Sequence, residues 1–227
     1  MRFDEILERL SRSGMRVFTT YDVAKMMGKP TAYASLMLHN SRRVSRIERG
    51  KYFIGDASIY EIASNVVFPS YVSMHAGLQY YGLLDQPVIK YSVISLKRHG
   101  RLEVKGSQIV FIKARRRAFF GYVNRDGAYI ASPEKLFVDC LYFGGVPFSM
   151  IKEALDSAKR ESLINTGLME RYAVEIRSGA LASRLGFLME QAGLKADGLL
   201  PHRCRGYVRI SDTGASGVDK KWMVRYD

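Results

Sequence analysis

The sequence predicts an α+β protein with a small, mainly helical amino-terminal domain, residues 1–56, and a larger mixed α/β domain, residues 57–227. Two observations predict this organisation. Within the first fifty-six residues, helical spacing of apolar residues occurs three times and is followed by a short segment of period two. Beyond them, helical segments enclose a group of strand-like runs. Hydrophobic residues make up 47% of the chain, so it can bury a core.

The first two helices are short and have recognisable ends. Residues 4–14 contain one, which Gly14 is suited to stop, and its apolar face consists of Ile6, Leu7 and Leu10. In residues 17–28, the hydroxyl of Thr19 or Thr20 can cap a second helix. That helix carries Asp22 in its first turn and ends at Gly28.

A third helix is expected after Pro30, which suits a first helical turn. Two orientations of this helix fit the pattern. The favoured one turns inward Tyr33, Leu36, Met37 and Asn40, and leaves outward Thr31, Ser35, Leu38 and Arg42. In the alternative orientation, Ala34 and Leu38 face inward.

The segment SRRVSRIERGKYFI, residues 41–54, combines positive charge with apolar residues of period two, and Gly50 predicts a hairpin turn within it. Three helices followed by a hairpin are the order of a winged helix-turn-helix. In that fold the third helix enters the major groove and the wing contacts the flanking backbone. Five of the eleven Lys and Arg residues before residue 56 lie in this segment, which favours phosphate contact over a solvated face. They are Arg42, Arg43, Arg46, Arg49 and Lys51.

The larger domain should contain both helices and strands. A helix pair comes first, with the second helix capped by Ser70 after Pro69. A further helix is expected to start at Ser132, with Pro133 in its first turn, and helical segments then continue to Gly193. Strands are expected in residues 88–96, 107–114, 118–123, 127–132 and 220–226.

The net charge of +13 favours an anionic partner, with nucleic acid as the first choice. The sequence has no run of about 18 apolar residues, so we expect no membrane span. The amino terminus lacks the apolar region of a secretory signal. Cys140 and Cys204 have no partners at zinc-ligand spacing, which indicates free thiols in a reducing cytoplasm.

Two segments resemble the AbiEi antitoxin family of prokaryotic transcriptional regulators: SMHAGLQYYGLLDQ, residues 73–86, and IASPEKLFVDCLYFGG, residues 130–145. Residues 17–54 fit the winged helix of the same family, and the likeness extends to about residue 160. The resemblance implies a DNA-binding amino-terminal domain and an α/β carboxy-terminal domain. It also implies repression of the protein's own operon and counteraction of a neighbouring nucleotidyltransferase-type toxin.

The residues do not indicate an enzyme. Glu134 and Lys135 are adjacent rather than spaced as in a metal-dependent nuclease, and Asp139 is expected to cap or to pair locally. Gly106 and Ser107 could suggest a nucleotidyltransferase, but no carboxylate follows before Asp126 to bind metal. The four histidines are far apart, and no phosphate-binding loop is present. We therefore expect no catalytic residue, metal or cofactor.

Two further basic clusters lie in the larger domain. One consists of Lys97, Arg98, Arg101 and Lys105, and the other of Lys113, Arg115, Arg116 and Arg117. A solvated surface explains them as well as a functional one does. The functional alternatives are an additional contact with the DNA backbone, or a face for an acidic or RNA-bound partner.

Together these observations predict a cytoplasmic repressor, the antitoxin of a toxin–antitoxin pair, bound to a double-stranded operator near its own promoter. Thr31 and Ser35, with Tyr33 or His39, would approach base edges, while the five cations of residues 41–54 hold phosphates. The larger domain would neutralise the toxin or arrange two copies on an inverted repeat. The alternative is a protein-binding module whose winged helix has lost DNA contact and recognises an acidic partner.

Overall fold

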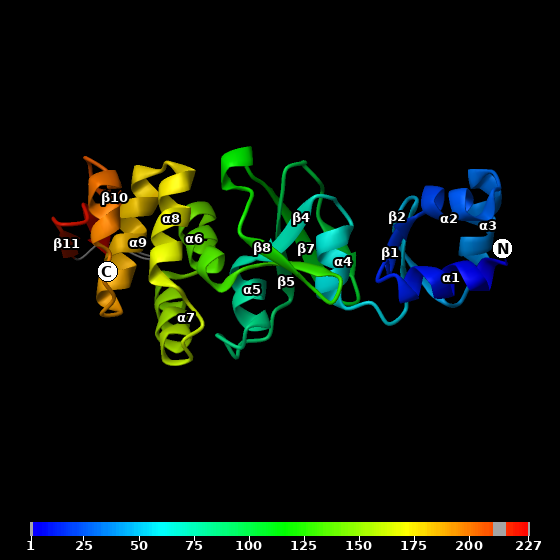
Figure 1. The fold of residues 1–227 in the computed structure, drawn as a ribbon, viewed down its shortest axis with the longest axis horizontal. Helices are drawn as coiled ribbons and strands as arrows, with labels where there is room; N and C mark the ends of the chain where they lie inside the picture. Colours follow the sequence, from blue (N-terminus) through cyan, green and yellow to red (C-terminus); the bar gives the residue numbers. More distant parts are fainter. Residues whose placement is uncertain (1, 211–216, 227) are drawn as a thin grey trace. The chain divides into compact units, whose positions relative to one another are not determined.

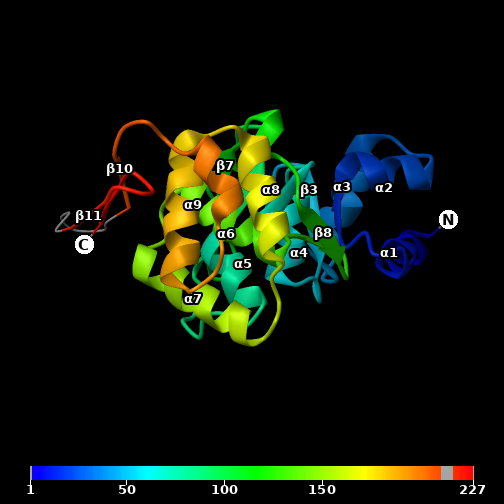
Figure 2. The same cartoon turned by 60° about the vertical axis from the view of Figure 1, so that its left-hand side comes forward.

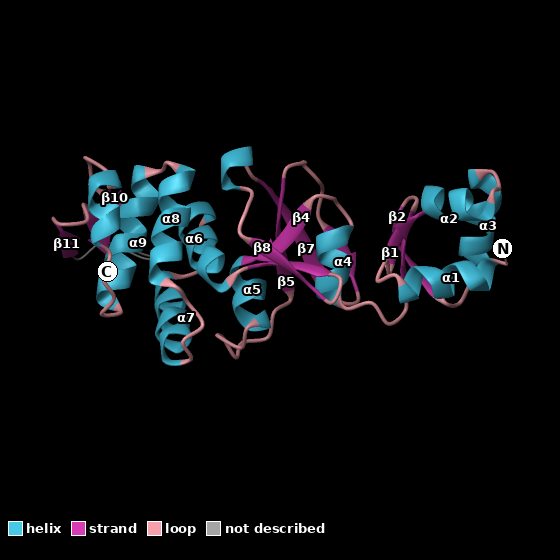
Figure 3. Ribbon diagram, viewed as in Figure 1, coloured by secondary structure: helices cyan, strands magenta, loops and turns pink. Residues whose placement is uncertain are grey.

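Three helices and a small antiparallel sheet begin the chain in the computed structural model, which describes residues 2–210 and 217–226 (Figures 1 and 3). The elements are α1 (Phe3–Arg12), β1 (Val17–Thr19), α2 (Thr20–Met27), α3 (Thr31–Asn40), β2 (Val44–Glu48) and β3 (Lys51–Ile54). The three strands lie in the order β1-β3-β2, and both pairings are antiparallel. This arrangement confirms the predicted helices and wing and adds β1, which was not predicted.

Local chemistry explains where α2 begins and ends. The Thr19 hydroxyl accepts a hydrogen bond from the backbone N–H of Asp22 (3.2 Å), and the Asp22 carboxylate accepts one from the backbone N–H of Thr19 (2.8 Å). This reciprocal pair satisfies two backbone donors at the start of the helix. Gly28 ends the helix in the left-handed region, at φ +63°. Both ends agree with the sequence prediction.

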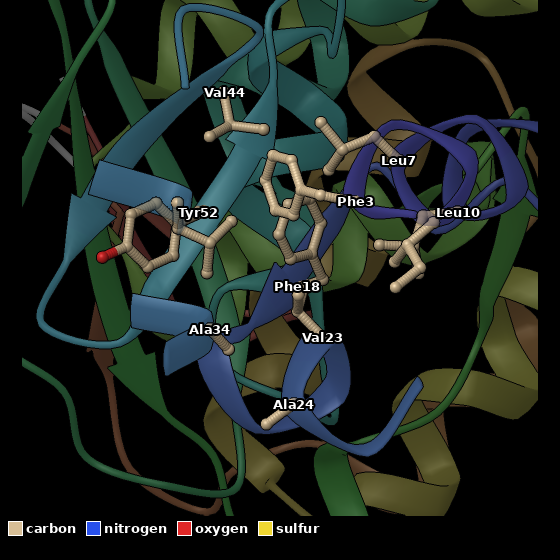
Figure 4. Packing of buried hydrophobic residues seen from close by; sticks show 11 residues of the cluster. Phe3, Leu7, Leu10, Phe18, Val23, Ala24, Ala34, Val44 and Tyr52 are labelled. Carbon is tan, nitrogen blue, oxygen red and sulfur yellow. The ribbon is translucent and has the colours of Figure 1, made fainter. Parts of the chain in front are cut away.

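The amino-terminal helices and the small sheet share one core (Figure 4). Ile6, Leu7 and Leu10 of α1 are buried in it, as predicted. Phe18 of β1 and Tyr52 of β3 contribute the sheet side of this core. The apolar positions of the wing hairpin therefore attach it to the helices.

A six-stranded mixed sheet follows, in the order β6-β7-β5-β4-β9-β8. Its strands are β4 (Ser70–Ser73), β5 (Lys90–Ser95), β6 (Leu102–Val104), β7 (Ser107–Lys113), β8 (Tyr122–Arg125) and β9 (Ala128–Ala131). Helix α4 (Ile59–Asn65) precedes β4. Strands β5 and β7 are parallel, and β6 is antiparallel to β7. The mixed sheet confirms the predicted α+β class.

The predicted helix beginning at Ser70 is wrong. Residues 70–73 form β4, which pairs in parallel with β9 through Val72 and Ile130, and helix α5 (Met74–Tyr80) begins only after it. The Ser70 hydroxyl donates to the backbone carbonyl of Ser64 (2.9 Å) instead of capping a helix. Residues 116–118 are likewise a short 3₁₀ helix, and β8 begins four residues later than the strand predicted from residue 118.

Helices dominate the rest of the chain (Figure 2). They are α6 (Pro133–Phe143), α7 (Phe148–Arg160), α8 (Thr166–Ile176) and α9 (Gly179–Gln191). As predicted, Ser132 caps α6, accepting a hydrogen bond from the backbone N–H of Lys135 (3.3 Å). Helix α6 packs against α5, α7, α8 and α9. A small sheet of order β10-β12-β11 comprises β10 (Val208–Arg209), β11 (Gly217–Asp219) and β12 (Val224–Tyr226).

The chain divides into two compact units that are built from interleaved segments. The first comprises Met1–Val72, Ile89–Lys113 and Val123–Ile130, and therefore joins the winged helix to the mixed sheet. The second comprises Ser73–Val88, Ala114–Tyr122 and Ala131–Asp227. The domain boundary at residue 56 stays a prediction.

Candidate nucleic-acid interface

Helix α3 turns Ala34 and Leu38 inward, and these side chains are only 0% and 2% exposed. They lie four positions apart on one face, where the small alanine lets α3 approach α2 closely. The favoured orientation from the sequence is therefore wrong, and the alternative is confirmed. Tyr33 and Leu36, expected inside, are 45% and 56% exposed. Met37 alone of the expected inward set packs against the core, and it does so only partly.

The outer face of α3 carries uncharged polar side chains. All four residues predicted to approach base edges are exposed: Thr31, Tyr33, Ser35 and His39. Hydroxyl and imidazole groups can both donate and accept hydrogen bonds, as base edges require. Leu36, which the sequence placed inside, adds an apolar side chain of the kind that contacts thymine methyl groups.

The wing is a short hairpin with a two-residue connection at Arg49 and Gly50. Gly50 has φ +76°, in the left-handed region that a residue with a Cβ rarely adopts. The register shifts between Arg46 and Glu48, a bulge in the edge strand β2. Four of the five predicted phosphate ligands are exposed: Arg42, Arg43, Arg46 and Arg49.

Two of these arginines have partners within the winged helix. Arg43 is 3.2 Å from the carboxylate of Asp4 on α1, and both side chains remain exposed. The Arg46 guanidinium donates to the backbone carbonyl of Glu48 (3.1 Å). Within residues 2–210 and 217–226, Arg42 and Arg49 have no carboxylate within 4 Å. An exposed surface ion pair contributes little, so an incoming phosphate can displace Asp4.

Lys51 is held differently from the arginines. Its ammonium donates to the backbone carbonyl of Val66 (2.7 Å) and lies 2.8 Å from the carboxylate of Glu48. Partial burial opposes ionisation of Glu48, but hydrogen bonds and charge from Lys51, together with His99, outweigh it and lower the pKa of that carboxyl. Lys51 thus ties the wing to the segment after α4, and its role as a phosphate ligand stays a prediction.

Sequence reasoning missed the contact that joins the wing to a basic loop. His99, in the loop between β5 and β6, places Nε2 3.2 Å from the carboxylate of Glu48. The same loop carries Lys97, Arg98 and Arg101, all exposed. The first predicted secondary cluster therefore lies beside the wing. A contact across fifty-one residues leaves no signal in the spacing of either segment.

The other secondary cations divide between structural and exposed roles. Lys105 donates to the backbone carbonyls of Gly55 and Ala57, and its ammonium lies 5.1 Å from the centre of the Phe53 ring. Lys113 is exposed at the end of β7. The remaining three are exposed and belong to the second unit: Arg115, Arg116 and Arg117.

The acidic residues that could suggest catalysis have structural partners. Glu134 accepts a hydrogen bond from the backbone N–H of Asn165 (3.1 Å), and Asp139 pairs with Lys135. In the described part of the chain, no three His, Cys, Asp or Glu side chains are grouped so that they could hold a metal ion. No described helix is both long enough and apolar enough to cross a bilayer.

Comparison with known proteins identifies the fold and leaves the family open. No family model matches the sequence, and no curated protein sequence matches it. Among solved structures, the chain is similar to the crystal structure of the Rv2827c protein from Mycobacterium tuberculosis, with a TM-score of 0.61 and 16% sequence identity. The match covers 98% of this chain and 90% of that one. Both units of this chain therefore share their fold with the Rv2827c protein.

Proposed function

We propose that this chain is a DNA-binding transcriptional repressor that acts as the autoregulating antitoxin of a toxin–antitoxin pair. The observation that carries the DNA-binding part is the exposure of the predicted contact residues of α3 together with all four arginines of residues 42–49. A winged helix uses these two elements for the major groove and the flanking backbone.

The two sets of side chains would do different work. Arginines neutralise phosphates irrespective of sequence and release counterions, so their contribution weakens as salt rises. Thr31, Ser35 and His39 would read base edges, which supplies sequence preference rather than most of the affinity. The net charge of +13 speeds the approach of the protein to a polyanion.

The DNA-binding proposal is tested by replacing Arg42, Arg43, Arg46 and Arg49 with alanine. The probe is a duplex from the region upstream of the protein's own coding sequence, and affinity is measured by fluorescence anisotropy across a salt series. We expect the log–log salt slope to fall by up to about 3.6, at roughly 0.9 for each phosphate that is no longer neutralised. A control variant with the same net charge replaces four exposed cations of the second unit with alanine: Arg171, Lys195, Arg205 and Lys220. Equal affinity of the two variants would refute the proposal.

The antitoxin role rests on the resemblance of residues 73–86 and 130–145 to the AbiEi family. In this role the chain would counteract a nucleotidyltransferase-type toxin encoded beside it. Co-expression with the adjacent open reading frame tests this directly, because growth arrest by that product should be relieved by the wild-type chain. The four-arginine variant should still relieve it if the protein acts on the toxin itself, and should fail if repression of the operon is required.

A second candidate is a protein-binding module that recognises an acidic partner. It is favoured by the exposure of large apolar side chains on the winged helix, with Tyr21 on α2 at 65% and Leu36 on α3 at 56%. Aromatic and apolar side chains of this kind are common at the centres of protein interfaces. This candidate would be favoured if the protein showed no salt-dependent change in anisotropy with duplex DNA and bound an acidic protein.

A further inference from the structure

We propose that the loop between β5 and β6, residues 96–101, is a second DNA-contacting element that binds backbone phosphates beside the wing. This inference rests on the DNA binding proposed above. The loop connects two strands of the mixed sheet and does not belong to the helix-turn-helix. Its proposed ligand is the phosphate backbone of the duplex immediately outside the segment covered by α3 and the wing.

The loop is held against the wing by His99. Nε2 of His99 lies 3.2 Å from one carboxylate oxygen of Glu48 and 3.3 Å from the other. The His99 ring also packs edge-on against Phe111 of β7, with 4.8 Å between ring centres. Nδ1 is 2.9 Å from the backbone carbonyl of Gly100. These contacts fix the ring from several sides, so the loop keeps its place next to the wing tip.

Sheet geometry brings the cations of this region to one edge. Strands β5 and β7 are parallel, with Ser95 opposite Lys113, so both strands end at the same edge of the sheet. Lys97 and Arg98 follow β5 at that edge. Strand β6 runs antiparallel to β7 with Leu102 opposite Ile109, so Arg101 precedes β6 beside the middle of β7.

The charge at this edge is left without internal compensation. Lys97, Arg98, Arg101 and Lys113 are exposed, and in the described ranges none has a carboxylate within 4 Å. Glu48, the acid that contacts this loop through His99, is already paired with Lys51. The loop contacts the wing through His99 and Glu48, and Glu48 immediately precedes Arg49, so the basic residues of the loop and the wing can follow one phosphate backbone.

Continuity with the wing favours duplex DNA over the other anionic partners. An acidic protein would need matching carboxylates, whereas a duplex that lies on α3 and the wing presents phosphates to the neighbouring surface without any further recognition. The loop would therefore add affinity and salt dependence and leave sequence preference unchanged.

The test replaces Lys97, Arg98 and Arg101 with alanine in the full-length chain. The matched control replaces Arg171, Lys195 and Arg205, three exposed cations of the second unit. On a duplex with flanking base pairs, we expect the loop variant to lower the log–log salt slope by up to about 2.7 relative to the control. On a duplex trimmed to the segment covered by α3 and the wing, the two variants should bind alike. Hydroxyl-radical footprinting should show that the loop variant no longer protects the flanking sugars and still protects the others.

His99 is a positioning residue that holds the loop against Glu48. A conservative replacement distinguishes this role from a direct contact between His99 and DNA. His99→Gln retains a side-chain N–H that can donate to Glu48, so it should keep the wild-type salt slope. His99→Ala removes the attachment of the loop to Glu48 and should lower the slope. Equal slopes for these two variants would contradict the attachment.

The outcomes separate this inference from the proposed function. If the wild-type chain binds duplex DNA, the four-arginine variant is weakened, and the loop variant matches its control on the long duplex, only the role of the loop is refuted. If the wild-type chain binds no duplex at any salt concentration, both proposals fail. An effect of the loop substitutions on single-stranded RNA but not on duplex DNA would also refute the loop as a DNA contact.

Discussion

Lys135 and Asp139 lie one turn apart on α6 and form an ion pair in which both side chains are 0% exposed. The pair has further partners inside the second unit. Asp139 accepts a hydrogen bond from the Ser73 hydroxyl (2.8 Å), and the Lys135 ammonium lies 5.1 Å from the centre of the Phe120 ring. Two charges removed from water require such compensation, because each would otherwise be costly to bury. The pair is therefore a structural feature of the helical unit.

Breaking this pair on one side should destabilise the protein strongly. Lys135→Met leaves the Asp139 carboxylate buried without its main partner, and we expect the free energy of unfolding to fall by about 3–5 kcal/mol. The double variant Lys135→Met/Asp139→Leu should recover much of that stability, because neither charge remains. Urea unfolding measures the stability of both variants. It can be followed by the fluorescence of Trp222, the chain's single tryptophan, which lies in the same unit.

A surface pair of identical spacing provides the control. Lys152 and Asp156 on α7 lie 3.2 Å apart with side chains 38% and 43% exposed. Lys152→Met should change the free energy of unfolding by less than about 1 kcal/mol. Similar decreases at the two lysines would show that burial does not determine the effect, contrary to this prediction.

Gly186 on α9 is required by close packing against Trp222. A Cβ built at this position would come within 2.1 Å of the indole ring, which is fully buried. Gly186→Ala should therefore displace the ring and lower the free energy of unfolding by about 1–3 kcal/mol, despite the higher helix propensity of alanine. The emission spectrum of Trp222 should change in the folded state. Gly206→Ala, where the added Cβ meets no atom within 4 Å, should leave the spectrum unchanged.

The elements that the sequence predicted correctly are those fixed by local chemistry. Thr19 and Asp22 form a reciprocal cap, Ser132 and Pro133 begin α6, and Gly50 allows the wing turn. Each of these signals acts over a few residues, so it can be read without knowledge of the tertiary structure.

The errors arose where distant partners decide the local structure. Residues 70–73 are a strand because β9, some sixty residues later, pairs with them, although a serine after proline is also a reasonable helix start. Strand β1 has three residues and depends on pairing with β3. In the candidate site, Lys51 points to a carbonyl fifteen residues away, which its position in a basic run does not reveal.

The orientation of α3 gives a direct comparison of two neighbouring leucines. Leu38 is 2% exposed and Leu36 is 56% exposed, although the sequence alone favoured the reverse. Leu38→Ala should lower the free energy of unfolding by about 2–5 kcal/mol, whereas Leu36→Ala should change it by no more than about 0.5 kcal/mol. Hydrogen exchange of the α3 amides measures how much each substitution lowers the stability of this helix. A larger decrease of protection in the Leu36 variant would contradict this prediction and favour the orientation in which Leu36 faces inward.

Glu48 should make the stability of the wing depend on pH. Its pKa is lowered in the folded state because Lys51 and His99 outweigh the effect of partial burial. For an acid with a depressed pKa, the stabilisation is fully present above the unfolded value of about 4.3 and is lost as the pH falls through the folded value. Glu48→Gln should therefore reduce protection of β2 and β3 amides at pH 6 and have a smaller effect near pH 3.

The comparison residue for Glu48 is Glu8, which pairs with Arg12 on the surface of α1 at 3.7 Å with both side chains exposed. Glu8→Gln should have little effect on wing amides at either pH, because exposed pairs contribute little. Hydrogen exchange at the two pH values, corrected for intrinsic rates, gives the free energy of opening for each variant. If Glu48→Gln lowers protection equally at both pH values, the stabilisation does not come from the ionised carboxylate. That result would contradict the prediction.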